Sequence, residues 1–152
     1  GVKPDVIAAA KALRVGATIS KRKMFPHVKG RIGGTWSEGN ALASAVGCVT
    51  IDVIQKEKLL RNASRQGAYV LRRLKELRRH SCVVDTRGIG LMDAIEFDTQ
   101  KTRDNVIGKC LKKGLLLLGA GYKAIRLLPP LNVTRREIDV AVDILNKVLR
   151  KV

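Results

Sequence analysis

The sequence has few aromatic residues and few acidic ones. Its aromatic residues are Phe25, Trp36, Tyr69, Phe97 and Tyr122, five among 152. Proteins that bind RNA or single-stranded nucleic acid usually stack bases on clustered aromatic rings, so this composition disfavours that class. Against 30 Lys and Arg there are only 13 Asp and Glu, which leaves a formal net charge of +17. A polyanionic partner is therefore the first alternative to test.

Paired cysteines and long apolar runs are also missing. Cys48, Cys82 and Cys110 lie far apart, and His27 and His80 do not stand at ligand spacing from them. This pattern disfavours a disulfide framework and predicts no metal site. No apolar run has the length that a bilayer requires, so we expect a cytoplasmic protein with no membrane partner. The start at Gly1 rather than Met suggests a piece of a longer protein.

An apolar fraction of 45% is enough to build a core. In the first third, Pro4 or Asp5 is expected to open a helical turn that continues to Leu13. Residues 14–39 are rich in glycine and indicate irregular structure, which at this length is typical of a functional segment. From Asn40 onward, small and apolar residues at helical spacing predict a helix.

The remaining pattern predicts an α+β module with one helical layer on a small sheet. A strongly amphipathic helix is expected over 57–79, and Thr134 and Glu137 form a capping box before a closing helix over 138–149. Between them the expected elements are two strands joined by the turn Gly88-Ile89-Gly90, a helix, and two further strands. These five elements are expected over 82–87, 91–97, 102–113, 115–118 and 124–128. We expect the domain boundary near residues 52–58.

Two features of the first third are candidates for a functional site: a lysine and a glycine-rich segment. Lys11 is the only charged residue between Asp5 and Arg14 and stands among small and apolar residues. It is either a Schiff-base amine or an ordinary surface lysine. The segment 33–40 contains Thr35 and has the composition of an anion-binding loop that leads into a helix, although a plain glycine-rich turn has the same composition.

Arg126 stands inside the apolar segment 125–131. An arginine in a buried strand must find an acid or an anionic ligand, because an unpaired buried charge is costly. Its planar guanidinium suits a carboxylate, so a ligand contact and a structural salt bridge both remain open.

Many basic residues lie along the predicted amphipathic helix, several of them on its outer face. Without a helix-turn-helix or zinc-finger frame, and without interleaved aromatic residues, such a pattern is more often a solvated face. The sequence therefore disfavours nucleic acid as a partner, and a basic nucleic-acid-binding module is kept only as the last alternative. The residues concerned are Arg61, Arg65, Arg72, Arg73, Lys75, Arg78, Arg79 and His80.

Taken together, four motifs in order resemble the C-terminal portion of a class III aminotransferase, a pyridoxal-phosphate enzyme of fold type I. The resemblance covers essentially the whole chain. The motifs are Lys3–Ile7 with Ala10–Leu13, Thr35-Trp36 with Gly39-Asn40, Arg87–Met92, and Ile125–Leu131.

The resemblance implies an α/β fold, in which residues 1–55 end the large cofactor-binding domain and residues 56–152 form a small α+β domain. It implies pyridoxal 5'-phosphate as cofactor, an amino acid and a 2-oxo acid as substrates, and a homodimer with shared active sites. It assigns Lys11 as the catalytic Schiff-base lysine, which binds the cofactor and moves a proton from the substrate carbon. Thr35 would bind the phosphate of the neighbouring subunit's cofactor, and Arg126 the substrate carboxylate.

Two departures from the family pattern lie near the cofactor. Residues 14–18 replace a run of glycines and a proline after Lys11, and residues 37–41 are one residue longer than usual. With these departures, two reactions remain open. One is transfer of an amino group from an amino acid of the 4-aminobutyrate, ornithine or lysine type, and the other is amino-acid racemisation. The family's aspartate at the pyridine nitrogen, main phosphate turn and stacking aromatic residue would all precede Gly1. We therefore expect the chain alone to be inactive.

Overall fold

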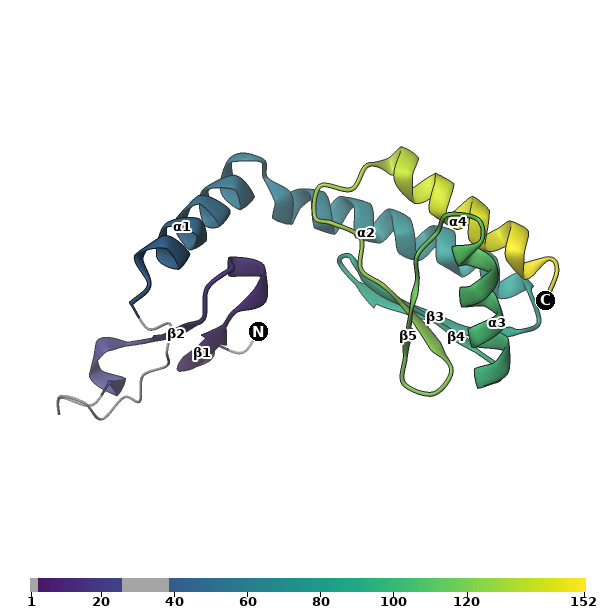
Figure 1. Ribbon diagram of the computed structural model, residues 1–152, viewed down its shortest axis with the longest axis horizontal. Coiled ribbons are helices and arrows are strands. Elements are labelled where there is room, and N and C mark those ends of the chain that lie inside the picture. Colours follow the sequence, from purple (N-terminus) through teal and green to yellow (C-terminus); the bar gives the residue numbers. More distant parts are fainter. Residues whose placement is uncertain (1–2, 26–38) are drawn as a thin grey trace. The chain divides into compact units, whose positions relative to one another are not determined.

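The computed structural model of the chain describes residues 3–25 and 39–152 (Figure 1). It divides into two units, Gly1–Glu57 and Lys58–Val152. No helix among the described residues is long and apolar enough to cross a membrane.

The first unit contains a two-stranded antiparallel sheet and one long helix. The sheet pairs Ile7 with Ile19, and the Ser20 Oγ donates a hydrogen bond of 2.8 Å to the Asp5 carbonyl. The elements are β1 (Val6–Ala9), the 3-10 turns η1 (Lys11–Leu13) and η2 (Arg22–Met24), β2 (Ala17–Ser20) and α1 (Ala41–Lys56).

The predicted helical turn leading to Leu13 is therefore wrong, since residues 6–9 form strand β1. The sequence around Val6 and Ile7 favours a strand once a partner strand is present, because β-branched side chains fit a pleated surface. That partner, β2, lies inside the segment expected to be irregular. Helix α1 begins where predicted, with the Asn40 Oδ1 accepting a hydrogen bond of 3.0 Å from the Ala43 amide.

The second unit has the predicted order of helix, two strands, helix, two strands, helix. Its elements are α2 (Leu59–Glu76), η3 (Leu77–Arg79), β3 (Val83–Ile89), β4 (Met92–Phe97), α3 (Gln100–Leu111), β5 (Leu118–Ala120), β6 (Ala124–Leu127) and α4 (Arg135–Leu149). The capping box of α4 is confirmed: the Glu137 amide donates to the Thr134 Oγ1, and the Thr134 amide donates to the Glu137 Oε2.

The four strands form one antiparallel sheet in the order β3-β4-β6-β5. Helix α2 packs on β3 and β4, α3 packs on β4, β5 and β6, and α4 packs along both helices (Figure 1). In β4, Asp93, Ile95 and Phe97 are buried, whereas Met92, Ala94 and Glu96 are not. Successive side chains of a strand point to opposite faces. The helices therefore cover one face of the sheet, and the other face is open in this unit.

Two boundaries in the second unit differ from the prediction. Gly88 and Ile89 belong to β3, opposite Asp93 and Met92, so the turn is only Gly90-Leu91. Of the strand expected over 115–118, only Leu118 lies in β5. The segment before it is used to end α3, with the Leu115 amide bonded to the Cys110 carbonyl at 3.0 Å.

The hydrophobic core lies in the second unit. All large apolar side chains that are buried among the described residues lie between Val70 and Leu149, and Leu74, Ile95, Phe97 and Ile125 are fully buried. In the described part of the first unit only Gly47 is buried.

Candidate functional site

Lys11 lies at the start of the turn that follows β1. The turn is closed by a 2.9 Å hydrogen bond from the Arg14 amide to the Lys11 carbonyl. Lys11 and Arg14 both have left-handed backbone conformations, with φ of 53° and 60°. A side chain makes this region unfavourable, and such strain is found disproportionately at functional sites. The Lys11 side chain is exposed, so its amine is free to react.

Helix α1 approaches this turn through a glycine. A Cβ built on Gly47 would lie 2.7 Å from the Val15 Cγ1 and 3.4 Å from the Leu13 carbonyl oxygen. Any larger residue would push the helix away from the turn. Gly47 therefore lets α1 support the backbone immediately after Lys11. Thr35 and the rest of the predicted phosphate loop, up to residue 38, lie outside the described residues.

Arg126 lies in the second unit, in the middle of β6. It pairs with Ala94 on β4 and Leu118 on β5, and it is exposed on the sheet face away from the helices. The apolar sequence around it led us to expect burial, and this was wrong because strand alternation places Ile125 in the core and Arg126 outside it. No carboxylate of the described residues lies within 4.0 Å of its guanidinium.

A second arginine on the same sheet face is, by contrast, neutralised. The Arg87 Nη1 donates hydrogen bonds of 2.9 Å to the Asp85 Oδ2 and 2.7 Å to the Glu96 Oε2. These bonds lower the pKa of both carboxyl groups and raise the pKa of Arg87. Lys123 adds an ion pair to Glu96 at 3.5 Å. Because Arg87 and Arg126 both pair with Ala94, this face presents one satisfied guanidinium and one available guanidinium.

The loop after β6 is held by a side chain that the sequence did not indicate. The Asn62 Nδ2 donates to the Leu131 carbonyl at 2.8 Å and to the Val133 carbonyl at 3.1 Å. Asn62 lies on α2, about seventy residues earlier in the chain. A single asparagine on a helix carries no signal of such a contact, which depends on how α2 packs. Asn62 fixes the path of the chain just after the strand that carries Arg126.

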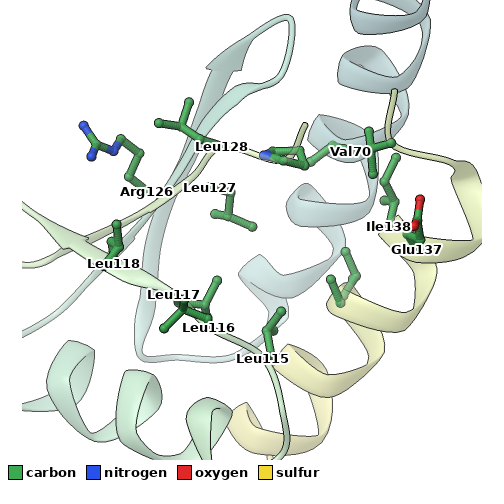
Figure 2. Close-up of a pocket in the computed structure, with 14 residues that line it drawn as sticks. Val70, Leu115, Leu116, Leu117, Leu118, Arg126, Leu127, Leu128, Glu137 and Ile138 are labelled. Carbon is green, nitrogen blue, oxygen red and sulfur yellow. The ribbon is translucent and has the colours of Figure 1, made fainter. Parts of the chain in front are cut away.

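A cavity of about 330 Å³ lies beside this strand, between β5, β6, α2 and α4 (Figure 2). Its lining is mainly aliphatic, from Val70 on α2 to Ile138 on α4. Figure 2 shows the Arg126 guanidinium pointing away from Leu127 and Leu117. Arg126 is nevertheless one of the residues that line the cavity, so the exposed sheet face on which it lies adjoins the cavity.

Asp93 is a buried acid that is 2% exposed. Among the residues that the structure describes, neither of its carboxyl oxygens has a hydrogen-bond partner, and the same is true of the Oγ1 of buried Thr86. Burial raises the pKa of Asp93 to about 6. Its space exists only because Gly88 lies opposite, where a Cβ would be 2.0 Å from the Asp93 Oδ1. Within residues 3–25 and 39–152 no group of three or more His, Cys, Asp and Glu is placed to hold a metal ion.

Known proteins match the chain along nearly its whole length. A sequence model of the family "Aminotransferase class-III" matches residues 1–149. Acetylornithine aminotransferase of Archaeoglobus fulgidus is 37% identical over 149 residues, which are 95% of this chain and 38% of that protein. Ornithine aminotransferase of Plasmodium falciparum is 38% identical over 160 residues, covering 99% of this chain and 38% of that protein.

A solved structure of lysine aminotransferase from M. tuberculosis has a TM-score of 0.88 at 32% identity. The match covers 99% of this chain and 36% of that chain. The chain thus spans less than half the length of the relatives that it matches, and it has the mixed α/β fold of the corresponding part of aminotransferase structures.

Proposed function

The chain belongs to the class-III aminotransferase family, and we propose that it is the C-terminal portion of a pyridoxal-phosphate-dependent transaminase. In this proposal residues 1–55 complete a large cofactor-binding domain, and residues 56–152 form the small α+β domain. The first unit supports this, because its β-strands and α1 expose many apolar side chains that a larger domain or a second subunit would cover. These exposed residues include Val6, Ile7, Ile19, Leu42, Val46 and Val49.

The observation that carries the proposal is the setting of Lys11. Its exposed amine lies on a strained turn, within a chain that matches the family from residue 1 to 149. A free primary amine fits covalent attachment of pyridoxal phosphate, which supplies an electron-accepting ring that acidifies the Cα–H bond of an amino acid. In this proposal the Nζ of Lys11 would hold the cofactor, and as a free amine it would take the proton from the substrate Cα.

Arg126 is proposed to bind the substrate carboxylate. Its guanidinium is exposed and has no carboxylate within 4.0 Å among the described residues, whereas neighbouring Arg87 already has two. A guanidinium can hold a carboxylate through two parallel hydrogen bonds, which fixes orientation as well as position. Asn62 supports this role by restraining the loop that follows β6.

Family membership supports a proposal for the assembly and the substrates. We propose a homodimer with shared active sites, in which Thr35 binds the phosphate of the neighbouring subunit's cofactor. The relatives are named for acetylornithine, ornithine and lysine. We therefore propose an amino donor with a distal amine, such as ornithine, lysine or 4-aminobutyrate, and a 2-oxo acid such as 2-oxoglutarate as acceptor.

Reductive trapping tests the role of Lys11. The complete enzyme, which includes the proposed remainder of the large domain, is incubated with pyridoxal phosphate and borohydride, and the modified lysine is located by mass spectrometry. We expect the adduct mainly at Lys11, its loss in Lys11→Ala, and no change in Lys21→Ala, which removes an exposed lysine just after β2 in the same unit. Equal labelling of several lysines would contradict the assignment. We also expect no transamination by the isolated chain, so that turnover by it would refute the need for the missing portion.

A racemase is the second candidate, because the departure from the family pattern at Arg14 leaves the reaction outcome open. The residue stands where the family usually has glycine, and it keeps the left-handed conformation that glycine would adopt without cost. This change lies three residues from Lys11, close to where the proton would be returned. Chiral analysis of the complete enzyme with an amino acid and no oxo acid distinguishes the two: racemisation without an acceptor supports the racemase, and its absence supports the transaminase.

A further inference from the structure

Helix α2 and the turn η3 that follows it carry five exposed basic residues, here called the basic stripe: Arg61, Arg65, Arg72 and Lys75 on α2, and Arg79 at the end of η3. At 3.6 residues per turn, the four positions on α2 fall within about 40° of one line along the helix. The buried residues Val70 and Leu74 occupy the opposite side. This part of the stripe therefore faces away from the core, and it runs for about 21 Å at 1.5 Å per residue.

The positive charge of the stripe is not neutralised within the part of the chain that the structure describes. The only acidic residue of α2 is Glu76, which pairs with Arg73 at 3.4 Å. Arg73 also binds Asp139 and Asp143 on α4. These carboxylates lie on the α4 side of α2 and are occupied by an arginine outside the stripe.

Three of the stripe's side chains are already restrained. The Arg72 guanidinium lies 5.1 Å from the centre of the Tyr69 ring. The Arg65 Nη2 donates to the Asn62 Oδ1 at 3.3 Å, and the Arg79 Nη2 donates to the Asn146 Oδ1 at 2.9 Å. Restrained side chains lose less conformational entropy when they bind a partner. The stripe is thus a partly ordered row of guanidinium groups.

The residue types of the stripe favour a nucleic acid over an anionic membrane as its partner. An interfacial membrane helix inserts an apolar face, but the apolar face of α2 is buried in the protein core. Four of the five residues are arginines, whose planar forks bind phosphate through two hydrogen bonds. A straight row of them suits a linear array of phosphates. Contacts to phosphates need no stacking aromatic rings, so the scarcity of aromatic residues does not oppose them.

We propose that the basic stripe binds the sugar-phosphate backbone of a nucleic-acid duplex without sequence preference. The surface is separate from the proposed carboxylate site. Helix α2 packs its buried side on the sheet face that the helices cover, whereas Arg126 lies on the open face. The proposal therefore does not depend on the proposed enzymatic function, and each can fail without the other.

Fluorescence anisotropy with a labelled 20-base-pair DNA duplex tests the proposal at several salt concentrations. About five phosphate contacts predict a slope of log affinity against log salt of roughly −4.5. The stripe variant is Arg61→Glu, Arg65→Glu and Lys75→Glu. We expect it to bind at least tenfold more weakly at low salt and to reduce the slope by about 3. Glutamate at 61 lies in the first turn of α2, where a negative charge is favourable.

A matched variant carries the same charge change on another helix. Lys101→Glu, Lys112→Glu and Lys113→Glu also lower the formal net charge from +17 to +11, but on α3 and its end, which α4 separates from α2. We expect its affinity to stay within threefold of the original. Equal weakening by both variants would overturn the proposal, because bulk charge would then explain the binding. Stronger stripe-dependent binding to phosphatidylserine vesicles than to DNA would also overturn it. If circular dichroism shows the stripe variant unfolded, the corresponding glutamine variant takes its place, with the same expected order of affinities.

Discussion

At the scale of single residues, Asp93 is a buried carboxyl group with no hydrogen-bond partner among the described residues. A carboxylate enclosed without a hydrogen-bond donor is unfavourable when ionised, and this disfavours the folded state at neutral pH. The folded-state pKa of about 6 lies above the ordinary value of 3.8. The native state therefore binds more protons than the unfolded state between these values, and stability falls as pH rises through this window.

We predict that Asp93→Asn stabilises the second unit at pH 7.5, by up to roughly 3 kcal/mol from a pKa difference of about two units. The gain should shrink as pH falls from 6 and vanish near pH 4, because the native carboxyl group is then neutral. Urea denaturation at a series of pH values measures this.

Glu96→Gln is the matched comparison on the same strand. The hydrogen bond from Arg87 lowers the pKa of the Glu96 carboxyl group. The contribution of Glu96 to stability is therefore present at neutral pH and is lost as pH falls through this pKa. The variant should therefore lose stability at pH 7.5 and approach the original protein in acid. If Asp93→Asn showed that same trend, Asp93 would have a stabilising partner.

At the scale of elements, Gly67 sets how closely α2 lies on the β3–β4 hairpin. A Cβ at this position would be 1.9 Å from the Gly90 carbonyl oxygen, which is a backbone atom and cannot rotate away. Gly90 itself has a φ of +57° in the two-residue turn. Gly67 of the helix thus packs directly against the backbone of Gly90 in the turn, and this contact orients α2 on the sheet.

We predict that Gly67→Ala destabilises the second unit by about 1–3 kcal/mol, because the helix must move off the turn. Gly108→Ala on α3 is the control. It has open space around its Cβ position and lies inside a helix. Alanine there should stabilise by roughly 0.5–1 kcal/mol through helix propensity. Thermal unfolding followed by circular dichroism compares the two, and a neutral Gly67→Ala would show that the contact is adaptable.

At the scale of the whole molecule, the two units differ in how they are stabilised. The second unit contains the buried apolar core, whereas the described part of the first unit buries only Gly47. Hydrophobic burial is the main favourable contribution to folding, so the first unit has little of its own.

We predict that residues 58–152 produced alone unfold in one cooperative transition and keep the protection of their amides against hydrogen exchange. Residues 1–57 produced alone should exchange within seconds, as an unfolded peptide does, because their apolar side chains have nothing to pack on. Exchange measured by mass spectrometry checks both fragments. Strong protection in the isolated first unit would show that it folds without further chain.

Much of the second unit could be predicted from local sequence. The period of apolar residues indicates α2 and α4, and the Thr134–Glu137 capping box fixes the start of α4, because these signals act within one or two helical turns. The wrong predictions each depend on a backbone contact. Residues 6–9 form a strand only because residues 17–20 pair with them, and Leu115 is drawn to the end of α3 by the Cys110 carbonyl. The first contact depends on a partner strand about ten residues away, and the second is a local end to α3 that the apolar period of 115–118 does not reveal.

The candidate site divides in the same way. By itself, the sequence determined the family motifs around Lys11, Thr35 and Arg126, since these are matters of residue type and order. Only the tertiary structure decided that Arg126 is exposed beside a neutralised Arg87, that Asn62 restrains the loop after β6, and that Asp93 is enclosed opposite Gly88. The physical reason is that exposure and partnership are set by strand pairing and helix packing. Asn62 contacts a loop about seventy residues away, and the contacts around Arg87 and Asp93 depend on the register of β3 against β4, which residue type and order do not specify.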